Sequence, residues 1–259
     1  MKLDFDGEKY RLASDQQKAW GRVLLSGLRL KGDEKILDLG CGDGVLTAEL
    51  AQLVPDGLVL GIDASASMIR TSRNDHVRPN VRFERLDINA IDFNAEFGLV
   101  FSNATLHWIK DHKKLLRNIF RSLKEHGVAR FQFAGDGNCS NLVRILKEVI
   151  SQERYAACFR TFDWPWYMPA VDEYRAMLDE VPFAEKKVWG ENADKYFESP
   201  EAMTKWIDQP SLVPFLACVA GEDRQRFRDA VVERMISETM QQDGTCFEMF
   251  RRINVLARK

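Results

Sequence analysis

The sequence predicts an α/β fold, a doubly wound and mostly parallel seven-stranded sheet with a helical cap insertion. Three observations support this prediction. Short apolar runs alternate with amphipathic stretches through the first half, as in strand-helix-strand units with right-handed crossovers. A glycine-rich turn follows the first apolar run, and a helical, aromatic segment separates that half from two later apolar runs.

The elements follow in chain order. Ser14-Asp-Gln-Gln17 has the form of a capping box, so we expect a helix through about Leu30, preceded by an arm. The expected strands are 35–39, 58–62, 81–86, 97–102, 127–134, 184–190 and one within 247–257, and the helices between the first five are 45–53, 65–73 and 111–124. Further helices are expected within 138–181, from Ser199 and over about 222–241. The domains are then an N-terminal arm and helix (1–34), a cofactor-binding core (35–135), a helical substrate cap (136–183 and 191–245), and the last core strands (184–190 and 246–259).

The turn after the first strand predicts a cofactor site. Gly40, Gly42 and Gly44 lack a Cβ, so the backbone can adopt positive φ and a ligand can approach it closely. A helix start of this kind also suits a pyrophosphate. Asp38 and Asp43 would repel phosphates, however, and they favour S-adenosylmethionine, which has a sulfonium, an ammonium and ribose hydroxyls.

Two more acids follow at the spacing of strand-helix-strand units. Asp63 lies 25 residues after Asp38 (63 − 38), and Asp87 lies 24 residues further on (87 − 63). We expect Asp63 to accept from the ribose hydroxyls, and Asp87 or the Ile88 backbone to meet the adenine. Three successive strand ends then form one pocket.

Composition narrows the possible partners. The net charge of −2 and the pI near 6.2 provide no basic surface for nucleic acid. The apolar runs are shorter than the roughly 20 residues that span a bilayer, and no apolar signal core is visible, so we expect no membrane partner and a cytoplasmic location. The five cysteines form no C-x-x-C pair, and His107 and His112 have no accompanying ligand pattern, so no metal site is expected. The oligomeric state is left open.

The Asp38–Gly44 pattern, acid-x-Gly-x-Gly-x-Gly, together with the spaced acids resembles the class I S-adenosylmethionine-dependent methyltransferases, which have a Rossmann-like fold. This resemblance implies an enzyme of that class. The cofactor-binding residues that it implies are Asp38, Gly40, Cys41, Gly42, Asp63, Ala64, Met68, Asp87, Ile88, Ser102 and Asn103.

The end of the fourth strand narrows the resemblance. Phe101–His112 is similar to the equivalent stretch of the trans-aconitate methyltransferases, and Thr105-Leu-His-Trp-Ile to that of the insect juvenile hormone acid methyltransferases. Both families make methyl esters of small carboxylic acids. The likeness extends to Tyr10–Gln17 and Phe250–Arg258, and it is loosest over 138–245. The stretch lacks the Asn/Asp-Pro-Pro-aromatic sequence of enzymes that methylate DNA bases.

The resemblance also implies roles at the substrate. Gln17 and Trp108 match residues that hold the substrate carboxylate, and with His107 they are the expected catalytic residues. Glutamine stands where the trans-aconitate enzymes have arginine near position 17, which argues against a tricarboxylate. The other expected substrate contacts are Tyr10, Trp164, Trp166, Tyr167 and Arg252.

Several alternatives stay open. The aromatic cluster Phe159–Pro169 either contacts substrate or packs the core of the cap. His107 serves as a base, as a wall of the substrate site or in packing. A carboxylate is ionised near pH 7 and needs no base, whereas a hydroxyl or carbon acceptor would require one. Two further hypotheses remain. The enzyme could methylate the carboxyl of a malonyl thioester, or the chain could be a catalytically inactive regulatory protein that binds the cofactor.

Overall fold

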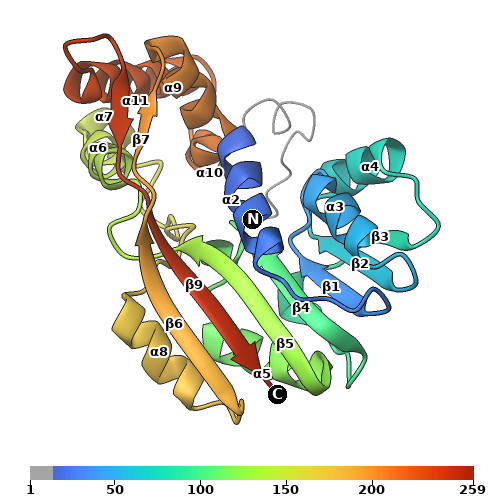
Figure 1. The fold of residues 1–259 in the computed structure, drawn as a ribbon. Coiled ribbons are helices and arrows are strands. Elements are labelled where there is room, and N and C mark those ends of the chain that lie inside the picture. The colour runs from blue at the N-terminus through green and yellow to red at the C-terminus, as the bar shows by residue number, and fades with distance from the viewer. Residues whose placement is uncertain (1–13) are drawn as a thin grey trace. The chain divides into compact units, whose positions relative to one another are not determined.

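A computed structural model describes residues 14–259. Tyr10 and the predicted arm therefore lie outside the described residues. A seven-stranded sheet has the order β3-β2-β1-β4-β5-β9-β6 (Figure 1). Its strands are β1 (Lys35–Leu39), β2 (Leu58–Asp63), β3 (Val81–Arg85), β4 (Phe97–Asn103), β5 (Leu123–Ala134), β6 (Glu185–Asn192) and β9 (Arg251–Arg258). Strands β1 to β5 pair in parallel and β9 is antiparallel to β5, so the predicted fold class is confirmed.

The described chain forms two compact units. The sheet unit comprises the described residues up to Asp136 together with Trp166–Glu191 and Arg252–Lys259, and the helical unit comprises Gly137–Pro165 and Asn192–Arg251. The helices of the sheet unit are α2 (Asp15–Ser26), α3 (Val45–Leu53), α4 (Ala66–Asp75), α5 (His112–Ser122) and α8 (Val171–Asp179), with short turns η1 (Ile88–Ala90) and η2 (Leu106–Trp108).

The helical unit has helices and one small sheet. Its helices are α6 (Ser140–Ile150), α7 (Glu153–Ala156), α9 (Pro200–Trp206), η3 (Ile207–Ser211), α10 (Val213–Leu216) and α11 (Asp223–Thr239). Strands β7 (Lys195–Phe197) and β8 (Cys246–Glu248) pair antiparallel. Helix α8 lies in the segment that the sequence analysis assigned to the cap, but it groups with the sheet because Tyr174 and Leu178 are buried in the sheet's core.

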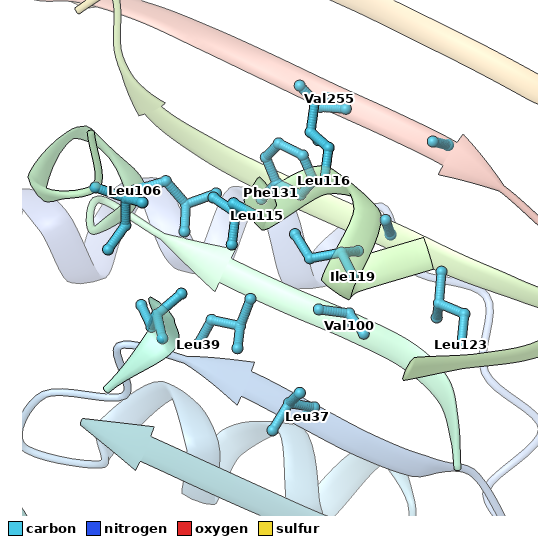
Figure 2. Packing of buried hydrophobic residues seen from close by; sticks show 14 of the residues in the cluster. Leu37, Leu39, Val100, Leu106, Leu115, Leu116, Ile119, Leu123, Phe131 and Val255 are labelled. Atoms are coloured by element: carbon cyan, nitrogen blue, oxygen red, sulfur yellow. The ribbon is translucent and has the colours of Figure 1, made fainter. Parts of the chain in front are cut away.

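The central strands β1 and β4 are buried on both faces, because their alternating side chains pack into two separate apolar clusters. In β1, Leu37 and Leu39 belong to one apolar cluster, whereas Ile36 belongs to another that includes Leu24 of α2 and Leu50 of α3. Figure 2 shows the first cluster, in which side chains of α5 pack against Val100 of β4 and Phe131 of β5. The two clusters hold the strand ends in a fixed register.

One local prediction was wrong. Helix α2 begins at Asp15, as the sequence suggested, but the Ser14 side chain makes no capping hydrogen bond to it. Ser14 has ψ of 13° instead of the extended backbone that places an N-cap hydroxyl over the first turn. The similarity of Ser14–Gln17 to a capping box therefore predicted the helix but not its cap.

Candidate functional site

The glycine turn connects β1 to α3 and is tied to the neighbouring strand. The amides of Gly40 and Cys41 both donate to the Ile62 carbonyl, at 2.8 and 2.9 Å. Gly40 has φ of +74°, and a Cβ there would lie 2.1 Å from Thr105 Cγ2. Glycine is therefore required at this position both by conformation and by space.

Two acids flank the turn from adjacent strand ends. Asp38 is buried, and its carboxylate accepts from Thr47 Oγ1 at 2.6 Å. Burial raises the pKa of Asp38 from 3.8 to about 7; the Thr47 hydroxyl opposes the shift and the negative charge of Asp63 adds to it. Asp63 accepts from the amides of Gly42 at 3.1 Å and Ser65 at 2.8 Å, so its carboxylate is held at the end of β2 beside the glycine turn.

The sequence analysis treated Asp43 as a negative charge that would repel phosphates, but in the structure this charge is paired. Asp43 Oδ2 lies 2.8 Å from Nζ of Lys18 on α2, and both side chains are nearly buried. The ion pair neutralises Asp43 and joins α2 to the glycine turn.

The remaining predicted cofactor residues lie along the ends of β2 and β3. Asp87 is exposed, and its carboxylate accepts from the Asn89 amide at 2.8 Å, so it caps η1, while Ile88 is buried. Met68 is buried on α4 and its amide donates to Ser65 Oγ. The Ala64 carbonyl accepts from Arg85 Nε.

The other predicted cofactor residue, Cys41, lies in the glycine turn after β1. Burial raises the pKa of its thiol, which is therefore unreactive.

The carboxyl end of β4 presents an amide with a fixed orientation. Asn103 Nδ2 donates to the Gln17 carbonyl of α2 at 2.8 Å, and Asn103 Oδ1 is buried with no hydrogen-bond partner among the described residues. The neighbouring Ser102 hydroxyl donates to the Leu39 carbonyl. After Ala104, at φ of +54°, Thr105 Oγ1 donates to the Gly40 carbonyl at 3.1 Å. The end of β4 is thereby fixed against both α2 and the glycine turn.

Buried polar groups gather on α2, η2, β5 and β9 of the sheet unit. Arg252 on β9 donates from Nε to Gln132 Oε1 at 3.2 Å, and its guanidinium stacks 4.5 Å from the Trp20 ring centroid. Burial and the positive charge of Arg252 lower the pKa of His107 well below its ordinary value, so the imidazole is neutral at pH 7. Gln17 Oε1 and His107 Nδ1 are buried and have no hydrogen-bond partner among residues 14–259.

Aromatic side chains from η2 and from the segment before α8 meet beside this cluster. Trp108 and Trp166 pack edge to face with ring centroids 5.9 Å apart. The Tyr167 amide donates to the His107 carbonyl at 2.8 Å, and its hydroxyl donates to Glu173. Trp164 instead belongs to the helical unit, where it packs on Phe215 with ring centroids 5.3 Å apart.

Sequence reasoning missed four residues at these strand ends: Lys18, Thr105, His112 and Gln132. Gln132 had a usable signal, since a glutamine between Phe131 and Phe133 on a buried strand needs a polar partner. Lys18 had none, because its partner is distant in sequence. Among residues 14–259, no three His, Cys, Asp or Glu side chains are grouped so as to hold a metal ion, and none of the helices in that range is long and apolar enough to cross a membrane.

The sheet order, the glycine turn and the acids after β1 and β2 define a Rossmann-like protein that binds a nucleotide-derived cofactor at its strand ends. Residues 36–127 match the family model described as a methyltransferase domain. An uncharacterized methyltransferase of Schizosaccharomyces pombe is 30% identical, over 97% of this chain and 99% of its own. The trans-aconitate 2-methyltransferase of Deinococcus radiodurans is 28% identical, over 91% of this chain and 92% of its own.

The fold also matches a solved structure, a Haemonchus contortus phosphoethanolamine N-methyltransferase 2 in complex with S-adenosyl-L-methionine. The TM-score is 0.63 at 18% identity, over 98% of this chain and 56% of that one. The present chain belongs to the class I S-adenosylmethionine-dependent methyltransferases, in the group that includes the trans-aconitate methyltransferases, and S-adenosylmethionine is its cofactor.

The residues present fit this cofactor. The glycine turn lies against the Asp63 carboxylate, a group that can accept from ribose hydroxyls, and Asn103 Oδ1 is a buried acceptor that suits a cation or an N–H donor. A phosphate would meet the Asp63 carboxylate, and the Gly40, Cys41 and Gly42 amides already donate to protein acceptors.

Proposed function

We propose that the enzyme transfers a methyl group from S-adenosylmethionine to the carboxylate of a small organic acid. The observation that supports this most directly is the buried polar cluster of the sheet unit, in which Gln17 Oε1 and His107 Nδ1 have no hydrogen-bond partner in the described chain. Buried polar groups of this kind require a ligand or water. The neighbouring Arg252 adds a positive charge, which favours an anionic acceptor.

Each side chain of the cluster has a distinct proposed role. A flip of the Gln17 amide exchanges its oxygen and nitrogen, so the buried position can present an N–H₂ donor to a carboxylate. Asn103 cannot flip without losing its bond to the Gln17 carbonyl, so its Oδ1 remains an acceptor and is assigned to the cofactor's ammonium. The indole N–H of Trp108 is the second donor to the substrate.

The reaction then needs positioning more than proton transfer. Bound S-adenosylmethionine supplies an electrophilic methyl group on its sulfonium. A carboxylate is already ionised, and His107, with its lowered pKa, is too weak a base to assist a hydroxyl acceptor near pH 7. In this proposal His107 is a wall of the acceptor site, and fixed alignment contributes about 7–11 kcal/mol to lowering the barrier. Trp166, Tyr167 and Arg252 border the same acceptor.

The relatives support the same substrate class. The Deinococcus radiodurans protein is named for trans-aconitate, which is a carboxylic acid, and it covers nearly the whole chain. Glutamine at position 17 favours a smaller or less charged acid. Tyr10 lies outside the described residues and Trp164 in the helical unit, so their contacts with substrate remain predictions.

The test is mass spectrometry of a carboxylic-acid panel incubated with the enzyme and S-adenosylmethionine. We expect at least one acid to gain a CH₂ unit, and base to release the methyl as methanol. Trp108→Phe and Gln17→Ala should lower kcat/KM by about tenfold or more, whereas Trp189→Phe, a partly exposed control on β6, should match the wild type. Methylation of a phenol, amine or thiol with no acid turned over would refute the proposal.

A further inference from the structure

Beyond the residues assigned to the acceptor site, a buried histidine holds the short turn that carries His107 and Trp108. His112, the first residue of α5, is 1% exposed. Its Nε2 lies 2.9 Å from the Leu106 carbonyl and its Nδ1 lies 3.1 Å from the Tyr174 hydroxyl of α8. His112, Leu106 and Tyr174 are not among the residues that we propose to contact the acceptor, and Leu106 is the first residue of η2.

The partners determine the tautomer. A carbonyl only accepts, so Nε2 must carry the proton and donate to Leu106, and in the neutral ring Nδ1 accepts from the Tyr174 hydroxyl. Burial lowers the pKa of His112 to about 4, against the opposing influence of the Leu106 and Ile109 backbone bonds and of Asp111 and Glu173. One uncharged tautomer therefore persists at neutral pH.

The His112 ring also packs against Tyr167, which lies in the segment before α8, and against Phe133 of β5. The His112 ring centroid lies 5.0 Å from Tyr167 and 5.3 Å from Phe133. The Tyr167 amide in turn donates to the carbonyl of His107. The turn is held from both sides, by His112 at Leu106 and by Tyr167 at His107.

Alternative anchors for the Leu106 carbonyl are weak. Within η2 this carbonyl accepts only from the Ile109 amide, in a single tight turn of three residues. Short turns of this type have poor hydrogen-bond geometry and little stability alone. Without the imidazole, the turn keeps its backbone bonds to Tyr167 and Thr105 but loses the side-chain donor at Leu106, so we expect the Trp108 indole to shift.

We infer that His112, with Tyr174 behind it, is a positioning residue that fixes the η2 turn so that Trp108 and His107 face the acceptor. It acts through Leu106 and does not exchange a proton with the substrate. This inference rests on the proposed function for the role of Trp108 but not for the geometry of the turn.

The test compares His112→Leu, which removes both hydrogen bonds, with His112→Gln, whose amide can still donate to Leu106. For His112→Leu we expect kcat to fall by roughly 10–100-fold, because small misplacements of reacting groups have effects of that size. The Kd for S-adenosylmethionine should stay within about twofold, and His112→Gln should recover most of kcat. Tyr174→Phe should give a smaller loss, with Tyr196→Phe, an exposed tyrosine of the helical unit, as its control.

A second readout does not depend on the acceptor. The indole N–H resonance of Trp108, assigned by its disappearance in Trp108→Phe, should shift or broaden in His112→Leu and return in His112→Gln. An unchanged Trp108 resonance with unchanged kcat in folded His112→Leu overturns the inference. The inference is also overturned if the loss of kcat in His112→Leu only follows the fraction of folded protein and His112→Gln does not restore kcat. If no acid is methylated, the proposed function fails, and the Trp108 resonance still decides the role of His112.

Discussion

Two buried polar side chains, Glu248 in the helical unit and Asn103 in the sheet unit, differ in how fully the protein satisfies them. In the helical unit, the Glu248 carboxylate is fully buried and accepts from the amides of Leu142 at 3.0 Å and Met249 at 2.8 Å, and from the Asn141 side chain. It completes the start of α6. In the sheet unit, Asn103 also binds the backbone through one atom, but it leaves the other without a protein partner. Glu248 is thus saturated by its own unit, whereas Asn103 keeps an acceptor that we assign to a ligand.

The largest expected effect comes from filling the glycine turn of the sheet unit. Gly40→Ala puts a Cβ 2.1 Å from Thr105 at φ of +74°. We expect cofactor affinity to fall more than about 100-fold, which corresponds to roughly 3 kcal/mol. Calorimetric titration with S-adenosylmethionine measures this affinity.

Gly221→Ala is the matched control in the helical unit. Gly221 has φ of +60°, but a Cβ there would meet no atom within 4 Å. We expect a loss of about 1 kcal/mol in the free energy of unfolding and an unchanged affinity. Equal affinities of Gly40→Ala and the wild type would contradict the assignment of this turn to the cofactor.

The second effect tests the structural role of Glu248. Glu248→Ala leaves the buried amide of Leu142 and the partly buried amide of Met249 without this acceptor, so we expect the free energy of unfolding to fall by about 2–4 kcal/mol. The Kd for cofactor of the folded variant should not change. Denaturant titration measures the loss, with Glu233→Ala, exposed on α11, as the control. If Glu248→Ala were as stable as the wild type but bound the cofactor more weakly, Glu248 would serve ligand binding and not the stability of the helical unit.

The third effect is the pH dependence of Asp38. Its folded pKa of about 7 lies above the ordinary 3.8, so the folded state binds this proton more tightly than the unfolded state. The contribution is fully present below about pH 4 and is lost as the pH rises through about 7. Relative to Asp38→Asn, the cofactor-free wild type should lose about 1–2 kcal/mol of stability between about pH 5 and pH 7. Parallel stability curves for the two proteins would show that Asp38 titrates normally.

The smallest expected effect is at His107. Its imidazole is neutral and weakly basic, so His107→Gln should change kcat by less than about fivefold at pH 7.5. A loss above about 100-fold, accompanied by the disappearance of an acidic limb from the pH-rate profile, would make His107 a base and would favour a hydroxyl or carbon acceptor.

Much of the sheet unit was predictable because its signals are local. Alternating apolar runs predicted β1 to β5, and the spaced acids with the turn from Gly40 to Gly44 predicted the cofactor, S-adenosylmethionine; its position at this turn stays a prediction. Partnerships over long sequence distances were not predictable. Nothing near Asp43 indicates that Lys18 neutralises it, and nothing near Arg252 indicates that it stacks on Trp20. Both contacts depend on the tertiary positions of α2 and β9 beside the strand ends. The spacing of residues along the sequence does not predict those positions.

The position of β9 has a consequence for how the chain is made. This strand lies between β5 and β6, although it begins 59 positions after β6 ends (251 − 192). Until it emerges from the ribosome, β5 and β6 present unpaired edges that invite association with other chains. The same strand brings Arg252, so the proposed acceptor site cannot be complete before β9 has joined the sheet.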